Sequence, residues 1–91
     1  MSKKRDRLEI IYTICKIIRD NRNQIKPTPL LRYTNISSQS FSEYYAELLE
    51  KEFIVENADK KGRKSIGLTE RGYAYLEKYK MILGFIDEFE L

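Results

Sequence analysis

The chain has 91 residues, of which 42% are hydrophobic and 34% are charged, and its formal net charge is +3. These values are typical of one small folded domain and exclude a disordered tail, while a core of this size leaves room for stabilisation by a partner subunit. The chain has no His and only one Cys, which excludes the usual metal-ligand sets and nucleophile pairs, so we expect no metal, no cofactor and no enzyme activity.

The basic N-terminal residues 1–7 lack the apolar segment of a signal peptide, and no apolar run reaches the ~18 residues of a membrane span. We therefore expect a cytoplasmic protein. The first helix is predicted over Lys3–Asn21, with Cys15 as a small buried hydrophobe on its apolar side.

The apolar residues of this first helix spread over more than half of its circumference, whereas a single core needs an apolar face of only about 100°. The helix therefore has a second contact side. It is either the central helix of a small domain, or its residues Ile10 and Ile17 meet a C-terminal helix or a second subunit.

A short strand is predicted at Gln24–Lys26, followed by a second helix. Thr28 is the expected cap of this helix and Pro29 its first residue, where a missing N–H costs nothing. About two helical turns follow, carried by the apolar residues Leu30, Leu31 and Tyr33.

The third helix is predicted over Ser38–Lys51, after a turn at Asn35-Ile36-Ser37. Ser37 is the expected N-cap, although Ser40 with Glu43 also matches a capping box and would move the start by three residues. The inner face is formed by Phe41, Tyr45, Leu48 and Leu49. The outer strip is formed by Gln39, Ser42, Glu43, Ala46 and Glu50. Such a strip is where a DNA-reading helix presents its side chains.

A hairpin is predicted from two β-branched and aromatic runs, Phe53–Glu56 and Ile66–Thr69. The segment between them, 57–65, contains Gly62 and is expected to form a solvated tip. Its basic residues are Lys60, Lys61, Arg63 and Lys64.

Thr69 is expected to cap a last helix that runs from Glu70 toward the C-terminus. Its apolar residues recur at spacings of four and three, which is the pattern of a coiled-coil seam. These residues are Tyr75, Tyr79, Ile82, Ile86 and Phe89. The same pattern also fits an amphipathic helix that folds back onto its own domain, and both interpretations stay open.

This order of elements predicts an α+β, mainly α fold: a winged helix-turn-helix with a two- or three-stranded wing, in a single domain over residues 1–91. Leu8-Glu9-Ile10-Ile11, Asn35-Ile36-Ser37, Leu48-Leu49-Glu50-Lys51 and Leu68-Thr69-Glu70-Arg71-Gly72 carry a resemblance to the small archaeal winged-helix DNA-binding proteins. In layout the chain is similar to the ten-kilodalton group that dimerises through a C-terminal antiparallel coiled coil. The resemblance implies a homodimer that binds double-stranded DNA, with residues 70–91 at the dimer interface.

The charge distribution indicates where DNA would bind. Residues 1–37 have a balance of +6, residues 38–59 of −5, residues 60–71 of +4 and residues 72–91 of −2. Phosphate contacts are expected from the basic hairpin tip, from Arg32 and Lys26, and from an N-terminal arm with Lys3, Lys4 and Arg5. Base or backbone contacts are expected from Ser38, Gln39, Ser42, Glu43 and Tyr44.

One departure from the resemblance concerns the outer strip of the third helix. Relatives tend to place Lys or Arg there, whereas this chain has Gln39, Ser42, Glu43 and Glu47. Two interpretations of its glutamates stay open: Glu43 accepts a hydrogen bond from the N4 amino group of cytosine, or Glu43 and Glu47 form a solvated face that repels phosphates. No metal partner accompanies them.

The leading functional hypothesis is a homodimeric transcriptional regulator. The alternatives are a sequence-indifferent architectural chromosome protein and a protein-interaction module in which the acidic helix docks a basic partner.

Overall fold

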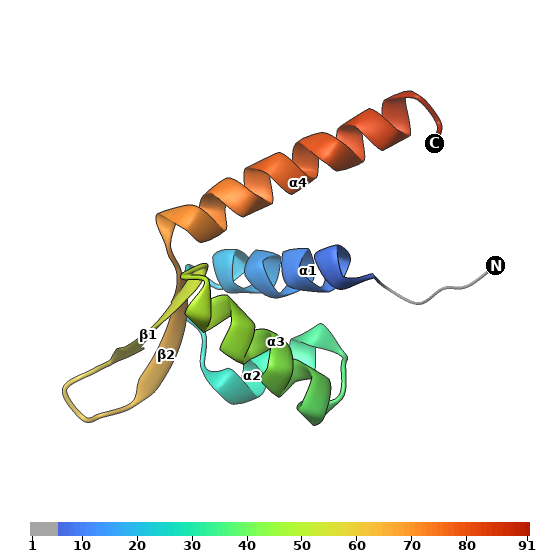
Figure 1. Ribbon diagram of the computed structural model, residues 1–91. Coiled ribbons are helices and arrows are strands. Elements are labelled where there is room, and N and C mark those ends of the chain that lie inside the picture. Colours follow the sequence, from blue (N-terminus) through green and yellow to red (C-terminus); the bar gives the residue numbers. More distant parts are fainter. Residues whose placement is uncertain (1–5) are drawn as a thin grey trace.

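The computed structural model describes residues 6–91, and its elements follow the predicted order (Figure 1). Four helices and two strands make up the fold: α1 (Arg7–Asp20), α2 (Pro27–Thr34), α3 (Ser38–Glu50), β1 (Ile54–Ala58), β2 (Lys64–Leu68) and α4 (Glu70–Glu88). The predicted α+β, mainly α winged-helix architecture is confirmed. Residues 3–5 of the predicted first helix lie outside the described residues.

Side-chain caps set the starts of three helices. Asp6, Ser37 and Thr69 each accept a hydrogen bond from the backbone amide three residues ahead, over 2.8, 3.1 and 3.1 Å. An N-terminal amide of a helix has no partner inside the helix, so each cap satisfies a group that would otherwise lack one. The start of α3 at Ser38 confirms Ser37, and not Ser40, as its cap.

The predicted cap of α2 is wrong. The helix begins at Pro27, two residues before Pro29, and Lys26 precedes it without a side-chain cap. The first of the two prolines starts the helix because its fixed φ and missing N–H suit that position, and Lys26 before it has the extended conformation that a following proline favours. Thr28 therefore lies inside the first turn. Asn35 ends α2 in the left-handed conformation and redirects the chain toward α3.

The core forms around α1, which contributes four buried residues, Ile11, Ile14, Cys15 and Ile18. The other helices and the hairpin close over this face with Ile25, Leu30, Phe41, Leu48, Ile54, Ile66, Leu68 and Leu76. Burial raises the pKa of the Cys15 thiol to about 12, so this residue behaves as the small hydrophobe that was predicted.

The hairpin pairs β1 with β2 in antiparallel register from Ile54 opposite Leu68 to Ala58 opposite Lys64. A single bridge adds the predicted short strand before α2: Ile25 and Ile66 exchange backbone hydrogen bonds of 3.1 and 2.7 Å. The wing therefore has two full strands and one bridged residue of a third.

The hairpin and α4 meet in a tight joint. The amide of Thr69 donates to the carbonyl oxygen of Phe53 over 3.1 Å, and its hydroxyl donates to the carbonyl oxygen of Glu52 over 2.5 Å. A Cβ at Gly72 would overlap the carbonyl oxygen of Phe53. The Leu68-Thr69-Glu70-Arg71-Gly72 sequence thus combines a helix cap with a glycine that lets the first turn of α4 lie against the backbone of Phe53, the residue before β1.

The first half of α4 packs on α1. Leu76 is buried in the core, and the Tyr75 hydroxyl donates to the carbonyl oxygen of Leu8 over 2.7 Å. The rings of Tyr12 and Tyr79 lie 4.8 Å apart between their centroids. This half of the helix is therefore fixed to the body of the domain.

The second half of α4 leaves the body, and the C-terminus lies away from the other elements (Figure 1). All residues from Lys80 to Leu91 are exposed. Seven of them are large hydrophobic residues: Met81, Ile82, Leu83, Phe85, Ile86, Phe89 and Leu91.

Candidate nucleic-acid interface

The outward strip of α3 takes no part in the core. Ser38, Gln39, Ser42, Glu43, Ala46 and Glu50 are all exposed. Phe41 and Leu48 are buried on the opposite face, with Tyr45 and Leu49 packed against the core. The helical projection of the sequence therefore placed both faces correctly. The strip leaves hydroxyl, amide and carboxylate groups free to meet base edges.

The start of α3 borders a shallow hollow with a mixed polar and apolar lining. Its lining includes Arg32 and Thr28 from α2, Asn35 from the turn and Ser38 from α3. The first amides of a helix carry partial positive charge, and here they lie beside a guanidinium and two hydroxyl groups. This combination suits a phosphate oxygen.

The hairpin tip is organised by one carboxylate. Asp59 accepts hydrogen bonds from the amides of Lys61 and Arg63, both over 2.9 Å, and from Nε of Arg63 over 2.8 Å. Gly62 closes the turn at a φ of +79°, a conformation that favours glycine. The backbone hydrogen bond from Arg63, together with the Arg63 side chain, lowers the pKa of Asp59. The tip thus has a defined turn.

The four basic residues of the hairpin are not equivalent. Arg63 is paired with Asp59, and Lys64 lies 3.7 Å from a carboxylate oxygen of Glu56. Lys60 and Lys61 are exposed and have no ion pair within residues 6–91. These two lysines therefore contribute most of the uncompensated charge at the tip.

Glu56 is also bound by a tyrosine of α3. The Tyr45 hydroxyl donates to a Glu56 carboxylate oxygen, which links the hairpin to the helix. Burial and this neighbouring carboxylate raise the pKa of Tyr45. The contact holds β1 against the C-terminal part of α3.

The interpretation of Glu47 as part of a solvated, repelling face is wrong. Its carboxylate accepts hydrogen bonds from Arg7 of α1 and from Lys51, and its side chain is only 20% exposed. Glu43 remains exposed, with no ion pair in the part of the chain that the structure describes. Tyr44 is half-buried beside Ser40 and Glu43, at the edge of the outward strip as expected.

The other predicted basic residues are dispersed. Lys26 is exposed before α2, whereas Lys3, Lys4 and Arg5 lie outside the described residues. Arg7 was missed as a candidate because its charge was counted only in the balance of residues 1–37 and was not placed beside α3. No local sequence signal links it to Glu47, 40 residues away.

The predicted dimer residues occupy two environments. Ile10, Ile17, Tyr75 and Tyr79 are partly buried, whereas Ile82, Ile86 and Phe89 are exposed. Ile17, Tyr79 and Ile86 line one groove between α1 and α4. The structure therefore brings the second side of α1 next to the C-terminal helix.

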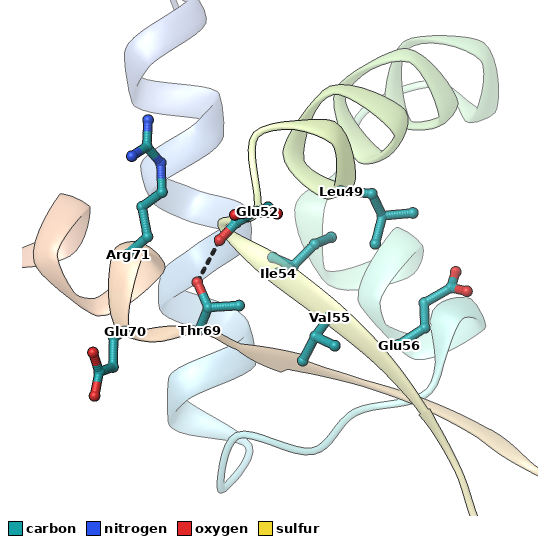
Figure 2. A pocket seen from close by; sticks show the side chains of 8 residues that line it. All are labelled: Leu49, Glu52, Ile54, Val55, Glu56, Thr69, Glu70 and Arg71. Atoms are coloured by element: carbon teal, nitrogen blue, oxygen red, sulfur yellow. Dashed lines mark hydrogen bonds between the residues drawn. The ribbon is translucent and has the colours of Figure 1, made fainter.

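A second hollow lies at the joint between α3, the hairpin and α4 (Figure 2). Figure 2 shows Thr69 bonded to Glu52 at its centre, with Val55 and Glu56 on the hairpin side and Arg71 on the α4 side. The Arg71 guanidinium carbon lies 5.2 Å from the centroid of the Phe53 ring. The lining of this hollow is mixed, with apolar and charged side chains, and these residues pack around the joint between the hairpin and α4.

Within residues 6–91 no three His, Cys, Asp or Glu side chains gather as a metal site would require. Among those same residues, no helix has the length and apolar character needed to span a membrane.

Comparison with known proteins agrees with this geometry. A family model described as winged helix-turn-helix matches residues 4–86. Sso10a-2, a DNA-binding protein from Sulfolobus solfataricus, superposes with a TM-score of 0.75 at 16% identity, over 94% of this chain and 86% of that one. F93 from STIV, a winged-helix DNA-binding protein, gives a TM-score of 0.73 at 21% identity, over 88% and 91%.

A bacterial regulator shares the fold over part of its length. MepR, a transcription regulator of the Staphylococcus aureus multidrug efflux pump MepA, gives a TM-score of 0.74 at 20% identity, over 89% of this chain and 60% of that one. No curated protein sequence matches the chain. At these identities the structures show a common fold, and the predicted resemblance to small winged-helix proteins is confirmed. The chain belongs to the winged helix-turn-helix family.

Proposed function

We propose that the protein binds double-stranded DNA as a homodimer and regulates transcription. One observation carries the proposal: the outward strip of α3 is free of the core, and the hairpin beside it extends from the body (Figure 1). At its tip, Lys60 and Lys61 have no ion pair among residues 6–91. A helix free to enter a groove and a basic strand pair beside it are the two parts that a winged-helix protein uses on DNA.

In this proposal α3 enters the major groove. The Gln39 amide can bond both the donor and the acceptor of adenine, Ser42 can bond any base edge, and Glu43 can accept from the N4 amino group of cytosine. Arg32, Ser38 and Tyr44 lie where they can contact phosphates at the edge of the groove. Because Glu43 has no ion pair in the described part of the chain, the helix supplies sequence preference more than attraction.

Attraction comes mainly from the hairpin. Lys60 and Lys61 are free to contact phosphates, and either can enter a narrow A·T-rich minor groove. Arg63 and Lys64 already lie beside carboxylates, so their contribution is smaller. Replacing all four by alanine should weaken binding to every sequence by a similar factor.

Dimerisation is proposed through α4. The exposed apolar residues of its second half would leave water when paired with a second copy, and Ile82, Ile86 and Phe89 form the centre of that contact. Ile10, Ile17, Tyr75 and Tyr79 form its border, because each is partly exposed while packing within its own chain. Burial of this apolar surface supplies the driving force.

A regulatory role is supported by the printed functions of structural neighbours such as MepR, a transcription regulator. The sequence-indifferent architectural protein is a second candidate, because the α3 strip has no Lys or Arg to add attraction at a specific site. A module for basic protein partners has less support, because Glu47, Glu56 and Asp59 are already paired.

The test is a mobility-shift titration of the full chain over a salt series, with genomic and random duplexes. Counterion release predicts a steep loss of affinity between low and moderate salt. Binding that is absent even at low salt overturns the proposal, and equal affinity for both duplex sets replaces the regulator with the architectural protein. Sedimentation should give a mass near twice 10.9 kDa.

A further inference from the structure

Arg7, the first residue of α1, is held against α3 by Glu47. Its Nη1 donates to Oε1 of Glu47 over 2.7 Å while Nη2 pairs with Oε2, so guanidinium and carboxylate meet edge to edge. Lys51, one helical turn after Glu47, donates to the same carboxylate over 2.8 Å. Two cations therefore share one anion, and the group has a net positive charge.

The exposure of the two partners differs. The Glu47 side chain is 20% exposed and the Arg7 side chain 52%, so the carboxylate is the inner member of the pair and the guanidinium the outer one. Together they border a polar hollow of about 270 Å³ that Ser40, Glu43 and Tyr44 also line. Arg7 thus stands at the edge of the strip that we propose enters the major groove.

The remaining donors of Arg7 suit a phosphate. A guanidinium carries five N–H groups, and its pairing with one carboxylate leaves N–H groups free for a second anion. An ion pair this exposed contributes little to folding stability. Its larger effect is to hold a long side chain in one orientation, which reduces the entropy that the side chain loses when it binds.

We infer that Arg7 contacts a DNA phosphate at the edge of α3, and that Glu47 is the positioning residue that holds it there. The inference rests on the proposed DNA binding. Glu47 thereby favours binding although its charge has the same sign as a phosphate. Lys51 offsets that charge, and the two-point pairing with Glu47 holds the Arg7 side chain outward.

The first pair of variants tests Arg7 against a matched loss of charge. Arg7→Gln is compared with Lys16→Gln, since Lys16 is exposed on the same helix and lines the groove facing α4. Mobility shift of the full chain on a mixed-sequence duplex over a salt series should show roughly tenfold weaker binding for Arg7→Gln, with a salt slope smaller by about one. Lys16→Gln should stay close to the unaltered protein. Equal losses for the two variants overturn the inference.

The second pair tests Glu47 against Glu50, which is exposed on the same helix and has no ion pair in the described residues. Glu50→Gln removes a repelling charge and should tighten binding. Glu47→Gln should weaken DNA binding about threefold, because Arg7 loses the carboxylate that holds its side chain in one orientation. In an Arg7→Gln background the weakening should disappear. Tighter binding by Glu47→Gln, equal to that of Glu50→Gln, contradicts the inference.

Thermal unfolding followed by circular dichroism checks that each variant folds. If Glu47→Gln unfolds, Arg7→Lys provides the test. Lysine keeps the positive charge but cannot form the two parallel hydrogen bonds of a guanidinium. The affinity for DNA should therefore fall while the salt slope stays unchanged. Affinity equal to that of the unaltered protein overturns the inference. Failure of the unaltered protein to bind DNA would instead reject the proposed function.

Discussion

The two halves of α4 contain similar side chains in different surroundings. In the first half, Leu76 is buried and Tyr75 and Tyr79 pack on α1. In the second half, Ile82 and Phe85 are 50% and 55% exposed although they are at least as apolar. The helix is continuous across both halves, so the difference comes from what surrounds each half.

This contrast identifies which part of the helix the domain needs for itself. The first half completes the core of one chain, while the second exposes an apolar surface that a single chain does not cover. Exposed apolar surface of this kind usually marks an interaction site. Substitutions in the first half should therefore change the stability of the domain, and substitutions in the second half should change association.

The largest effect is expected from replacing Ile82 and Ile86 together by Glu. Charged groups in a paired apolar face are strongly unfavourable, so dimer affinity should fall by about a hundredfold or more. Sedimentation equilibrium measures this change. Lys80→Glu, an exposed substitution outside the predicted seam, is the control and should leave the mass unchanged. A monomeric unaltered protein would reject dimerisation itself.

Next in size is Leu76→Ala, which removes a core side chain and should lower the free energy of unfolding by about 3 kcal/mol. Leu83→Ala makes the same change in the exposed half. Measured by urea denaturation in the Ile82→Glu, Ile86→Glu background, it should cost under about 1 kcal/mol. Equal costs would mean that the two halves do not differ in the single chain.

The glycines of α4 should respond with opposite signs. At Gly72 a Cβ would overlap the Phe53 carbonyl oxygen, so Gly72→Ala should destabilise the domain by about 2 kcal/mol. At Gly84 nothing lies within 4 Å of an added Cβ, and Ala is the better helix former, so Gly84→Ala should stabilise it by roughly 0.5 kcal/mol. Thermal unfolding of both variants tests this, and a shared sign would contradict it.

A smaller effect than at Leu76 or Gly72 is expected at Tyr75, whose hydroxyl donates to the Leu8 carbonyl oxygen. Tyr75→Phe should lower the free energy of unfolding by about 1 kcal/mol, while exposed Tyr73→Phe should leave it unchanged. Burial raises the pKa of Tyr75 to about 12, so the folded state favours the neutral phenol. That contribution is complete below pH about 10 and is lost as pH rises toward 12. Urea denaturation over this range should show a weaker alkaline loss for Tyr75→Phe.

Local chemistry was sufficient to predict most of the fold. Ser37 and Thr69 were identified as caps because their hydroxyl groups precede helical patterns, and Gly62 with its basic neighbours indicated a hairpin tip. Each of these signals acts over a few residues. The exception was α2, where two prolines lie two residues apart and the first of them starts the helix, leaving Thr28 inside the turn.

The arrangement of charges in the candidate interface was harder to predict. Sequence showed Glu47 and Arg7 as members of an acidic and a basic segment, but their pairing depends on how α1 lies against α3. The spacing of Tyr75 and Tyr79 was equally ambiguous. Apolar residues that recur at intervals of four and three form the same pattern whether the partner helix belongs to the same chain or to another. Only the packing of the first half of α4 on α1 assigns those two tyrosines a contact within the chain.

The joint at Thr69 and Gly72 connects the hairpin and α4 into one rigid unit. The hairpin is bonded to the start of α4 through Phe53 and Glu52, so neither can move relative to the other without breaking those bonds. If two copies pair through α4, the angle between the hairpin and α4 and the length of α4 set the distance between the two hairpins along a duplex. Because a helix rises about 1.5 Å and turns about 100° per residue, one residue inserted after Lys80 would rotate the pairing face and change that distance. In such a dimer, the geometry of the joint would set the spacing of the DNA half-sites that the two hairpins reach.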